Sequence, residues 1–478
     1  MKTSSEIIKT SGVAFGTSGA RALVSDLTPE TCMAFAASFT AVMKQSFSFK
    51  RMALGIDNRP SSYAIAQSCA AALSAAGIDV WYCGVLPTPA LAYAAMQADI
   101  PCIMVTGSHI PFDRNGLKFY RPDGEISKAD ELAILNTSAP VDVPNSLPAL
   151  VLDSSAAEAY VERYVAPFDS TLLAGKKIGI YEHSSSGRDL YASLFSQLGA
   201  EVQSLERSDE FVPIDTEAVA EEDKTKARAW SKEYGFDAIF STDGDGDRPL
   251  IADENGEWLR GDVLGLLCSQ ALSVDALAVP VSCNTAIELS DSFDKVVRTK
   301  IGSPYVIEAF AALAQEHNNI AGFEANGGFL LGSDVDVNGK LIKALPTRDA
   351  VLPALMLLSA AKDCGIAKLV AALPQRFTDS DRIKNFATVK SKAIIAKAVE
   401  EGIASVSELM NNLGFDGEKV ESFDITDGLR INLSDATIVH LRPSGNAPEL
   451  RCYAESDNPE ASKRLVQQAL NKVQTITI

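Results

Sequence analysis

Apolar residues recur along the chain at spacings that predict strands and helices in turn. A buried strand over Met52–Asp57 precedes a helix over Ser62–Ala76, which ends at Gly77, and a second strand follows over Ile78–Cys83. The apolar run Ile103–Val105 continues the alternation as a further strand. A strand–helix–strand order of this kind is typical of an α/β unit.

This order returns twice further along the chain. After Gly175 the pattern predicts, in order, strand Lys177–Tyr181, helix Arg188–Leu198, strand Ala200–Leu205, helix Asp223–Tyr234 and strand Phe236–Ser241. After Gly256 it predicts helix Asp262–Leu272, strands Ala276–Val281 and Lys295–Arg298, helix Tyr305–Gln315 and an apolar helix over Val351–Leu373. The recurrence favours three related α/β domains with mixed sheets.

The last hundred residues follow another pattern. Two predicted helices, Ser391–Glu400 and Val406–Leu413, lead into short strands over Val420–Phe423, Leu429–Leu433, Thr437–Leu441 and Leu450–Ala454, and an amphipathic helix over Pro459–Val473 closes the chain. We therefore expect a smaller C-terminal α+β domain. The predicted domain limits are residues 1–150, 151–255, 256–372 and 373–478.

Composition narrows the classes of partner. The chain has 478 residues, 43 Lys and Arg against 62 Asp and Glu, and a formal net charge of −19, which argues against binding to nucleic acid or to anionic membranes. Charged residues interrupt the apolar helix over Val351–Leu373, so it is too polar to span a membrane. The eight cysteines show no metal-binding or disulfide spacing, and the chain starts without a signal-peptide pattern. We expect a cytoplasmic protein with free thiols.

The turn after the strand Ile103–Val105 carries the first candidate chemistry. Gly107 precedes Ser108 and His109, and Lys118 follows an Asn-Gly pair. A serine on such a turn is a candidate nucleophile, although most Ser-His pairs are ordinary loop residues. Whether Ser108 is catalytic depends on what the rest of the chain supplies.

The stretch Asp243-Gly-Asp-Gly-Asp-Arg248 follows a predicted strand and is the strongest local signal. Asp243, Asp245 and Asp247 alternate with glycines, so their carboxylates can converge on one divalent cation. An EF-hand is excluded, because its sixth position requires glycine and is Arg248 here, and because a strand precedes the loop. A solvated acidic turn is the structural alternative.

Three other loops carry weaker signals. Arg442, Ser444, Gly445 and Asn446 lie in the sequence RPSGNAP and could cradle a phosphate group, although a tight turn would explain the same residues. Glu324 and Asn326 lie in GFEANGG, between two predicted strands, and could bind sugar hydroxyls. Arg21 ends the sequence FGTSGAR and is a candidate anion ligand.

Taken together and in this order, these loops resemble those of the α-D-phosphohexomutase family. The resemblance covers about residues 15 to 455, and it implies four domains around a central cleft, the last of which closes over a phosphate of the substrate. It implies that Ser108 is the phosphoserine and that Asp243, Asp245 and Asp247, together with the Ser108 phosphate, bind Mg²⁺. The same comparison places Arg21, Arg248 and Lys118 at cationic positions around this centre, with Lys118 or His109 as the proton-transfer group.

The implied reaction interconverts hexose 6-phosphate and hexose 1-phosphate through a phosphoserine enzyme and a hexose 1,6-bisphosphate. Glu324 and Asn326 would bind the sugar, and Arg442, Ser444, Gly445 and Asn446 would hold the non-reacting phosphate. The sugar loop lacks the histidine of the family's GEMSGH sequence, and the phosphate loop has Asn446 and Ala447 in place of Thr and Glu. The resemblance favours mannose, with glucose or glucosamine phosphates as alternatives.

Two other classes of function are compatible with these loops. A sugar-phosphate-binding protein without turnover would not need the aspartate triad, and a phosphatase would release the phosphoryl group to water.

Because the substrate must reverse its ends, we also expect the C-terminal domain to move on a hinge near residues 370–385.

Overall fold

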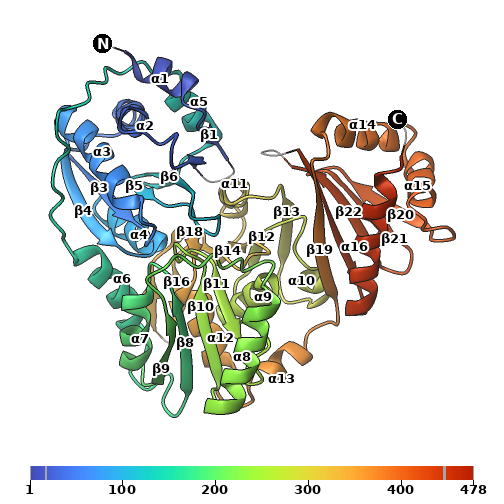
Figure 1. Cartoon of the computed structure of the whole chain (residues 1–478). Coiled ribbons are helices and arrows are strands. Elements are labelled where there is room, and N and C mark those ends of the chain that lie inside the picture. Colours follow the sequence, from blue (N-terminus) through green and yellow to red (C-terminus); the bar gives the residue numbers. More distant parts are fainter. Residues whose placement is uncertain (1, 17–18, 338, 445–447, 477–478) are drawn as a thin grey trace. The chain divides into compact units, whose positions relative to one another are not determined.

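The computed structural model describes residues 2–16, 19–337, 339–444 and 448–476. The chain divides into a first compact unit, residues 1–277 and 302–370, and a second, residues 278–301 and 371–478. Both have α/β architecture with antiparallel or mixed sheets (Figure 1). A division into two units does not test the four predicted domain limits, which stay a prediction.

The first sheet of the first unit positions the Ser108 turn. Its strand order is β1-β2-β6-β5-β3-β4, with β7 paired to β6. Strand β3 runs parallel to β4 and β5, whereas β6 is antiparallel to β5 and β2, so the sheet is mixed. The strands are β1 (Ala14–Phe15), β2 (Ala20–Leu23), β3 (Arg51–Ile56), β4 (Asp79–Val85), β5 (Cys102–Val105), β6 (Arg114–Arg121) and β7 (Gly124–Glu125).

Helices of this part of the unit pack against that sheet over one large apolar core. Phe35, Phe39 and Phe119 meet at its centre, the last two with ring centroids 4.9 Å apart. The helices of this core are α1 (Ser4–Thr10), α2 (Pro29–Met43), α3 (Ser62–Ala75) and α5 (Lys128–Asn136), whereas the residues of α4 (Thr88–Gln97) and α6 (Ser155–Val165) lie outside it. Helix α3 ends one residue before the predicted limit, and the predicted strands of this region are confirmed with shifts of one or two residues.

The second sheet positions the aspartate loop. Strands β8 (Lys177–His183), β9 (Glu201–Arg207) and β10 (Ala238–Thr242) are parallel, and β11 (Pro249–Ala252) pairs antiparallel with β10. Helices α7 (Arg188–Gln197) and α8 (Glu221–Tyr234) were both predicted, and α8 ends at Gly235 in the left-handed conformation (φ +66°). The β10–β11 pair forms a hairpin with residues 243–248 at its turn.

The rest of the first unit holds the predicted sugar loop between two antiparallel strands. Strand β15 pairs with both β14 and β18, and β16 forms a separate hairpin with β17. The elements are α9 (Gly261–Ala271), α11 (Ser303–Leu313), β14 (Ile320–Phe323), β15 (Phe329–Leu331), β16 (Val335–Val337), β17 (Lys340–Ile342), β18 (Leu345–Asp349) and α12 (Val351–Ala360).

The single helix predicted over Val351–Leu373 is wrong. The structure has α12 and a separate α13 (Ile366–Ala371). Gly365 breaks the helix because its φ is +84°, and Glu254 Oε2 accepts hydrogen bonds from the backbone N–H groups of Ile366 and Ala367. The apolar pattern continues through the break, so periodicity alone could not show it.

The second unit contains an antiparallel sheet with the order β19-β23-β22-β21-β20. Its core joins this sheet to its helices, among them the amphipathic α16, which begins as predicted with Asn458 Oδ1 accepting a hydrogen bond from Ala461 N. The elements are β12 (Ala276–Pro280), where the two units divide, α10 (Ala286–Leu289), β13 (Lys295–Thr299), β19 (Phe377–Lys384), α14 (Thr388–Val399), α15 (Ile403–Asn412), β20 (Val420–Asp424), β21 (Leu429–Leu433), β22 (Ile438–Pro443), β23 (Glu449–Ser456) and α16 (Pro459–Val473). The mixed α/β fold class is confirmed.

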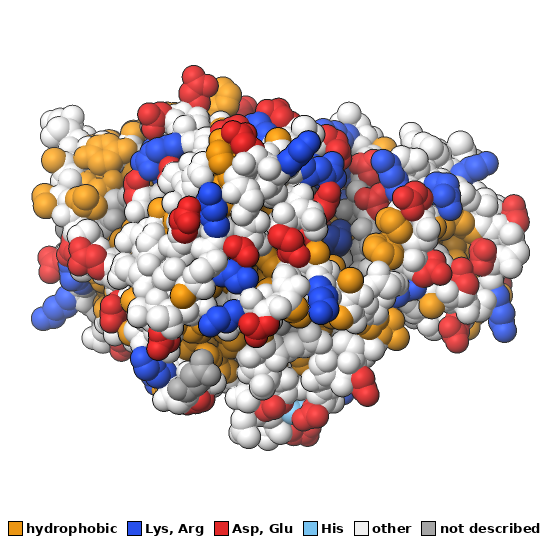
Figure 2. Space-filling model, turned by 90° about the horizontal axis from the view of Figure 1, so that it is seen from below, with side chains coloured by type: hydrophobic (Ala, Val, Ile, Leu, Met, Phe, Trp, Pro, Cys, Tyr) orange, Lys and Arg blue, Asp and Glu red, His pale blue; other side chains and the backbone are white. Residues whose placement is uncertain are grey.

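Three further features bear on the predictions. Residues 377–384 of the predicted hinge segment form β19, which pairs with β23 along its whole length, and the hinge stays a prediction. Among the described residues, no helix combines the length and apolarity that crossing a membrane requires. On the face in Figure 2, acidic and basic side chains are interspersed rather than separated by sign.

Candidate active site

Ser108 lies in the connection between β5 and β6, at the carboxyl end of a buried strand. Its side chain is completely buried, and Oγ donates a hydrogen bond to Asp243 Oδ2 at 2.7 Å. Its φ is +55°, in the left-handed region that residues with a Cβ rarely adopt. Such a conformation costs about 1–3 kcal/mol and is concentrated at functional sites. The backbone therefore marks Ser108 independently of its neighbours in sequence.

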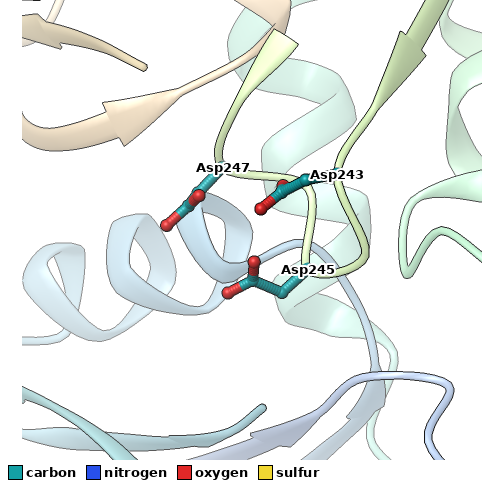
Figure 3. Close-up of side chains that lie close together, drawn as sticks. All are labelled: Asp243, Asp245 and Asp247. Carbon is teal, nitrogen blue, oxygen red and sulfur yellow. The ribbon is translucent and has the colours of Figure 1, made fainter. Parts of the chain in front are cut away.

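The three aspartates of the β10–β11 turn converge as predicted. Asp243, Asp245 and Asp247 are all completely buried, and one carboxylate oxygen from each lies within 4.8 Å of the others. Figure 3 shows the three side chains projecting from one loop toward a common point. A solvated acidic turn is excluded, because no part of the triad is exposed.

The glycines between the aspartates are required by close approach. A Cβ at Gly244 would lie 2.7 Å from the Ser108 carbonyl oxygen. Gly246 has φ +74°, and a Cβ there would lie 2.9 Å from Cβ of Pro87. The Asp-Gly-Asp-Gly-Asp spacing therefore lets the triad lie directly against the Ser108 turn.

Two basic side chains and a hydroxyl bond to carboxylates of the triad. Lys118 Nζ donates to Asp245 Oδ2 at 2.5 Å and to Asp247 Oδ2 at 2.6 Å. Arg348 Nη2 lies 2.9 Å from Asp247 Oδ2, and Thr88 Oγ1 donates to Asp245 Oδ2 at 2.7 Å. Because Lys118 comes from β6 and Arg348 from β18, the site joins the first and third sheet regions of the unit.

The charges of the triad are unevenly compensated. Burial raises the pKa of Asp243 well above its usual range, and repulsion by Asp245 and Asp247 adds to this effect. Burial also opposes ionisation of Asp245, but the ammonium of Lys118 outweighs it and lowers the pKa of that carboxyl. The basic residues therefore stabilise the charge of Asp245 more than that of Asp243.

The donor set fits a divalent cation. Asp245 Oδ1 and Asp247 Oδ1 are buried and accept no hydrogen bond from any described residue. Carboxylate oxygens are the ligands that hard cations such as Mg²⁺ prefer, and a buried carboxylate oxygen without a partner is costly. The residues present could therefore bind a metal ion.

The basic residues near Ser108 form a second group. Arg248 Nη1 donates to His109 Nδ1 at 2.9 Å, and Ser108 Oγ lies 3.3 Å from the same nitrogen. Burial, reinforced by Arg248, lowers the pKa of His109 to about 3, so this imidazole is neutral near pH 7. Burial and repulsion by Arg248 lower the pKa of Arg21 to about 10. Arg21 is therefore a second cation close to Arg248.

The predicted sugar loop lies between β14 and β15. Glu324 is buried, and its Oε2 lies 3.4 Å from Arg348 Nη1. Asn326 Oδ1 accepts a hydrogen bond from Gly328 N at 3.0 Å, so this side chain stabilises the loop itself. Arg348 thus connects Glu324 to the aspartate triad.

The predicted phosphate loop follows β22 in the second unit. Arg442 Nε donates to Asp427 Oδ2 at 2.9 Å, and Ser444 N donates to Glu449 O at 2.9 Å. Gly445 and Asn446 lie outside the described residues. The described part therefore shows an oriented arginine at the end of a strand.

Comparison with known proteins agrees with this arrangement. A phosphomannomutase from Salmonella muenchen is 57% identical over 470 residues, which cover 98% of this chain and 97% of that protein. This chain belongs to the α-D-phosphohexomutase family. A phosphomannomutase of Sinorhizobium fredii is 42% identical, with 96% of this chain and 98% of that protein covered.

Models of the family's separate domains also match this phosphohexomutase. Phosphoglucomutase/phosphomannomutase alpha/beta/alpha domain I matches residues 12–141, alpha/beta/alpha domain III residues 260–377, and the C-terminal domain residues 377–472. The structure of a putative phosphomannomutase from Thermus thermophilus superimposes with a TM-score of 0.73 at 21% identity, covering 97% of this chain and 99% of that one. That likeness shows the same fold.

Several residues of this phosphohexomutase's site were not predicted from the sequence. Arg348 lies inside a strand, where no turn or glycine marked it as a functional residue. Asp57 and Arg59 follow β3, which is parallel to β5, and the carboxyl ends of parallel strands meet at one edge of a sheet. That adjacency was a usable signal, because it places both residues beside the Ser108 turn.

Proposed function

We propose that this phosphohexomutase is a phosphomannomutase, which interconverts mannose 6-phosphate and mannose 1-phosphate. The observation that carries the proposal is the 2.7 Å hydrogen bond from Ser108 Oγ to Asp243, inside a buried triad that can hold a cation. Identity of 57% and 42% to two phosphomannomutases over nearly the whole chain supports mannose as the sugar.

Asp243, Asp245 and Asp247 would hold Mg²⁺, and phosphorylated Ser108 would add a phosphate oxygen. When bound, the cation would neutralise charge on the phosphoryl group and so stabilise its transfer. Ser108 and Asp243 are already adjacent, so one site would bring the ion and the phosphoryl group together. Lys118, Arg248 and Arg21 would contribute the remaining positive charge.

The phosphoryl group would move twice. In the first step a hydroxyl oxygen of the sugar phosphate attacks phosphorus, the bond from phosphorus to Ser108 Oγ breaks, and hexose 1,6-bisphosphate forms. After this intermediate turns around, Ser108 Oγ attacks the other phosphate, whose bond to the sugar oxygen breaks. Ser108 is phosphorylated again, and the sugar hydroxyl regains a proton.

Lys118 is the better candidate for proton transfer. The Nδ1 lone pair of His109 already accepts a hydrogen bond from Arg248, and its low pKa makes the imidazole a weak base. Lys118 Nζ donates to both Asp245 and Asp247, and could exchange a proton with the sugar oxygen once a cation takes over these carboxylates. His109 would then orient Arg248.

Other parts of the chain would recognise the substrate. Glu324 would bind sugar hydroxyls, and Asn326 would support it by shaping the loop. Arg442, whose orientation Asp427 sets, would bind the non-reacting phosphate together with Ser444, Gly445 and Asn446. Arginine suits this task because its fork can donate two parallel hydrogen bonds to one phosphate.

The test compares initial rates on the 1-phosphates of mannose, glucose, glucosamine and N-acetylglucosamine, with hexose 1,6-bisphosphate present and inorganic phosphate measured in parallel. We expect the highest kcat/KM with mannose 1-phosphate and phosphate release far below sugar conversion. A higher kcat/KM for another sugar would replace mannose. Phosphate release equal to conversion would identify a phosphatase, and binding without conversion a non-catalytic protein.

A further inference from the structure

Arg59 is buried beneath the Ser108 turn and uses every N–H of its guanidinium. A guanidinium has five N–H donors in a planar fork. Here Nε donates to Asp57 Oδ2, Nη1 to the carbonyl oxygens of Pro111 and Arg114, and Nη2 to those of Ser108 and Ile110, at distances from 2.5 to 3.1 Å. One side chain therefore binds the turn from residue 108 to residue 114.

Asp57 binds the amino side of the same turn. Its Oδ2 accepts hydrogen bonds from Thr106 Oγ1 at 2.8 Å and Gly107 N at 3.3 Å. Thr106 Oγ1 in turn accepts a hydrogen bond from Ser108 N at 2.8 Å. The Ser108 N–H is thus linked to Asp57 through one hydroxyl, and the Ser108 carbonyl is bonded directly to Arg59.

Both backbone groups of Ser108 are consequently held by one ion pair. Arg59 and Asp57 have completely buried side chains, with Arg59 Nε and Asp57 Oδ2 3.1 Å apart. Gly107 has no side chain because a Cβ there would lie 2.5 Å from the Arg59 guanidinium carbon, and Phe211 packs on the guanidinium with its ring centroid 4.0 Å away. The pair is fixed from several sides.

These hydrogen bonds hold Ser108 in a backbone conformation that serine does not favour. Ser108 has φ +55°, which a serine in a free loop would leave. Its Oγ is aimed at Asp243 only while the backbone keeps this angle. We propose that Asp57, Arg59 and Thr106 are positioning residues, which hold the Ser108 backbone in its left-handed conformation so that Oγ carries the phosphoryl group against the aspartate triad.

The proposal rests on Ser108 as the phosphoryl carrier and makes a specific kinetic demand. None of the three positioning side chains bonds to the triad in the structure, so substrate affinity should change little when they are altered. Phosphoryl transfer should slow, because displacement of a reacting group by about 1 Å can cost on the order of a hundredfold in rate. Lysine cannot replace Arg59, because it lacks the planar fork.

The sharpest test changes Thr106. Thr106→Val keeps the shape but removes both hydrogen bonds of the hydroxyl, whereas Thr106→Ser keeps the hydroxyl. We expect Thr106→Val to lower kcat at least about tenfold with KM within about twofold, and Thr106→Ser to retain most of the wild-type kcat. The rate of phosphoryl transfer from phosphorylated enzyme to the sugar can be followed by intact mass in a single turnover. It should decrease in the same order.

Arg59→Lys extends the test, with Arg51→Lys as the matched control from the exposed start of β3, the strand that precedes Arg59. We expect a larger kcat loss from Arg59→Lys than from Thr106→Val and none from the control, with melting temperature measured for each variant. A folded Thr106→Val enzyme with wild-type kcat, or equal losses in Thr106→Val and Thr106→Ser, would overturn the proposal. Ser108→Ala serves as the reference: if it retains turnover, the proposed function itself fails.

Discussion

Lys118 compensates two buried carboxylates that could also bind a divalent cation. Replacing Lys118 should therefore make the free energy of unfolding depend on that cation. Its ammonium lies 2.5 Å from Asp245 Oδ2 and 2.6 Å from Asp247 Oδ2, and all three side chains are buried. Removing one partner of a buried ion pair typically costs about 3–5 kcal/mol, because the remaining charge is uncompensated. We expect Lys118→Met to lose about this much unfolding free energy in chelator.

Added Mg²⁺ should restore much of that loss. A cation that binds only the folded state adds stability that grows with the logarithm of its concentration above Kd, and Lys118→Met removes the ammonium that competes for the same carboxylates. The assay is urea denaturation with EDTA and with a series of Mg²⁺ concentrations. Mutase activity should stay low throughout, because the proposed proton-transfer group is missing.

The control is Lys343→Met, which removes an exposed ion pair with Asp334. Exposed pairs contribute about 1 kcal/mol or less, so this variant should be close to wild type and should show the wild-type response to Mg²⁺. A deficit in Lys118→Met that Mg²⁺ leaves unchanged would refute the view that cation and ammonium share the triad.

Three further outcomes follow from the structure. Arg348→Met should lower kcat/KM by at least about tenfold and destabilise the fold by about 3–5 kcal/mol, because two buried carboxylates lose their shared cation; steady-state kinetics and denaturation check both. Gly244→Ala should abolish most activity, since its Cβ would lie 2.7 Å from the Ser108 carbonyl, and retained activity would show that the loops can separate. Burial lowers the pKa of His183 and of His440 to about 4, below the unfolded value near 6.5. Their contribution to the free energy of unfolding is therefore complete above about pH 6.5 and is lost as the pH falls toward 4. Calorimetry at pH 7 and pH 5 should therefore show a lower melting temperature at pH 5, and a melting temperature independent of pH in this range would contradict the argument.

The sequence predicted most elements that have a regular period and a clear end. Helix α16 was predicted over its full length because apolar residues recur at helical spacing between Asn458 and the end of the helix. The break at Gly365 was missed because the apolar residues continue through it, and only the hydrogen bonds from Ile366 and Ala367 to Glu254 show why the helix restarts.

Prediction of the site shows the same limit. Ser108 and the aspartates could be recognised because they lie in turns with glycines, whose spacing reflects close backbone approach. Arg348 and Arg59 could not be recognised in the same way, since their roles depend on which strands lie side by side. A local pattern reveals residues that shape their own loop, whereas residues that support another loop are found only once the neighbouring strands are known.

The most direct test of the central claim is to locate the phosphoryl group during turnover. Enzyme incubated with hexose 1,6-bisphosphate and Mg²⁺ would be digested and its peptides analysed by mass spectrometry, before and after addition of mannose 1-phosphate, alongside Ser108→Ala. We expect one phosphorylated peptide, modified at Ser108, whose phosphoryl group exchanges with the sugar, and an inactive, unmodified Ser108→Ala enzyme. Phosphorylation at another residue, or wild-type turnover by Ser108→Ala, would contradict the account.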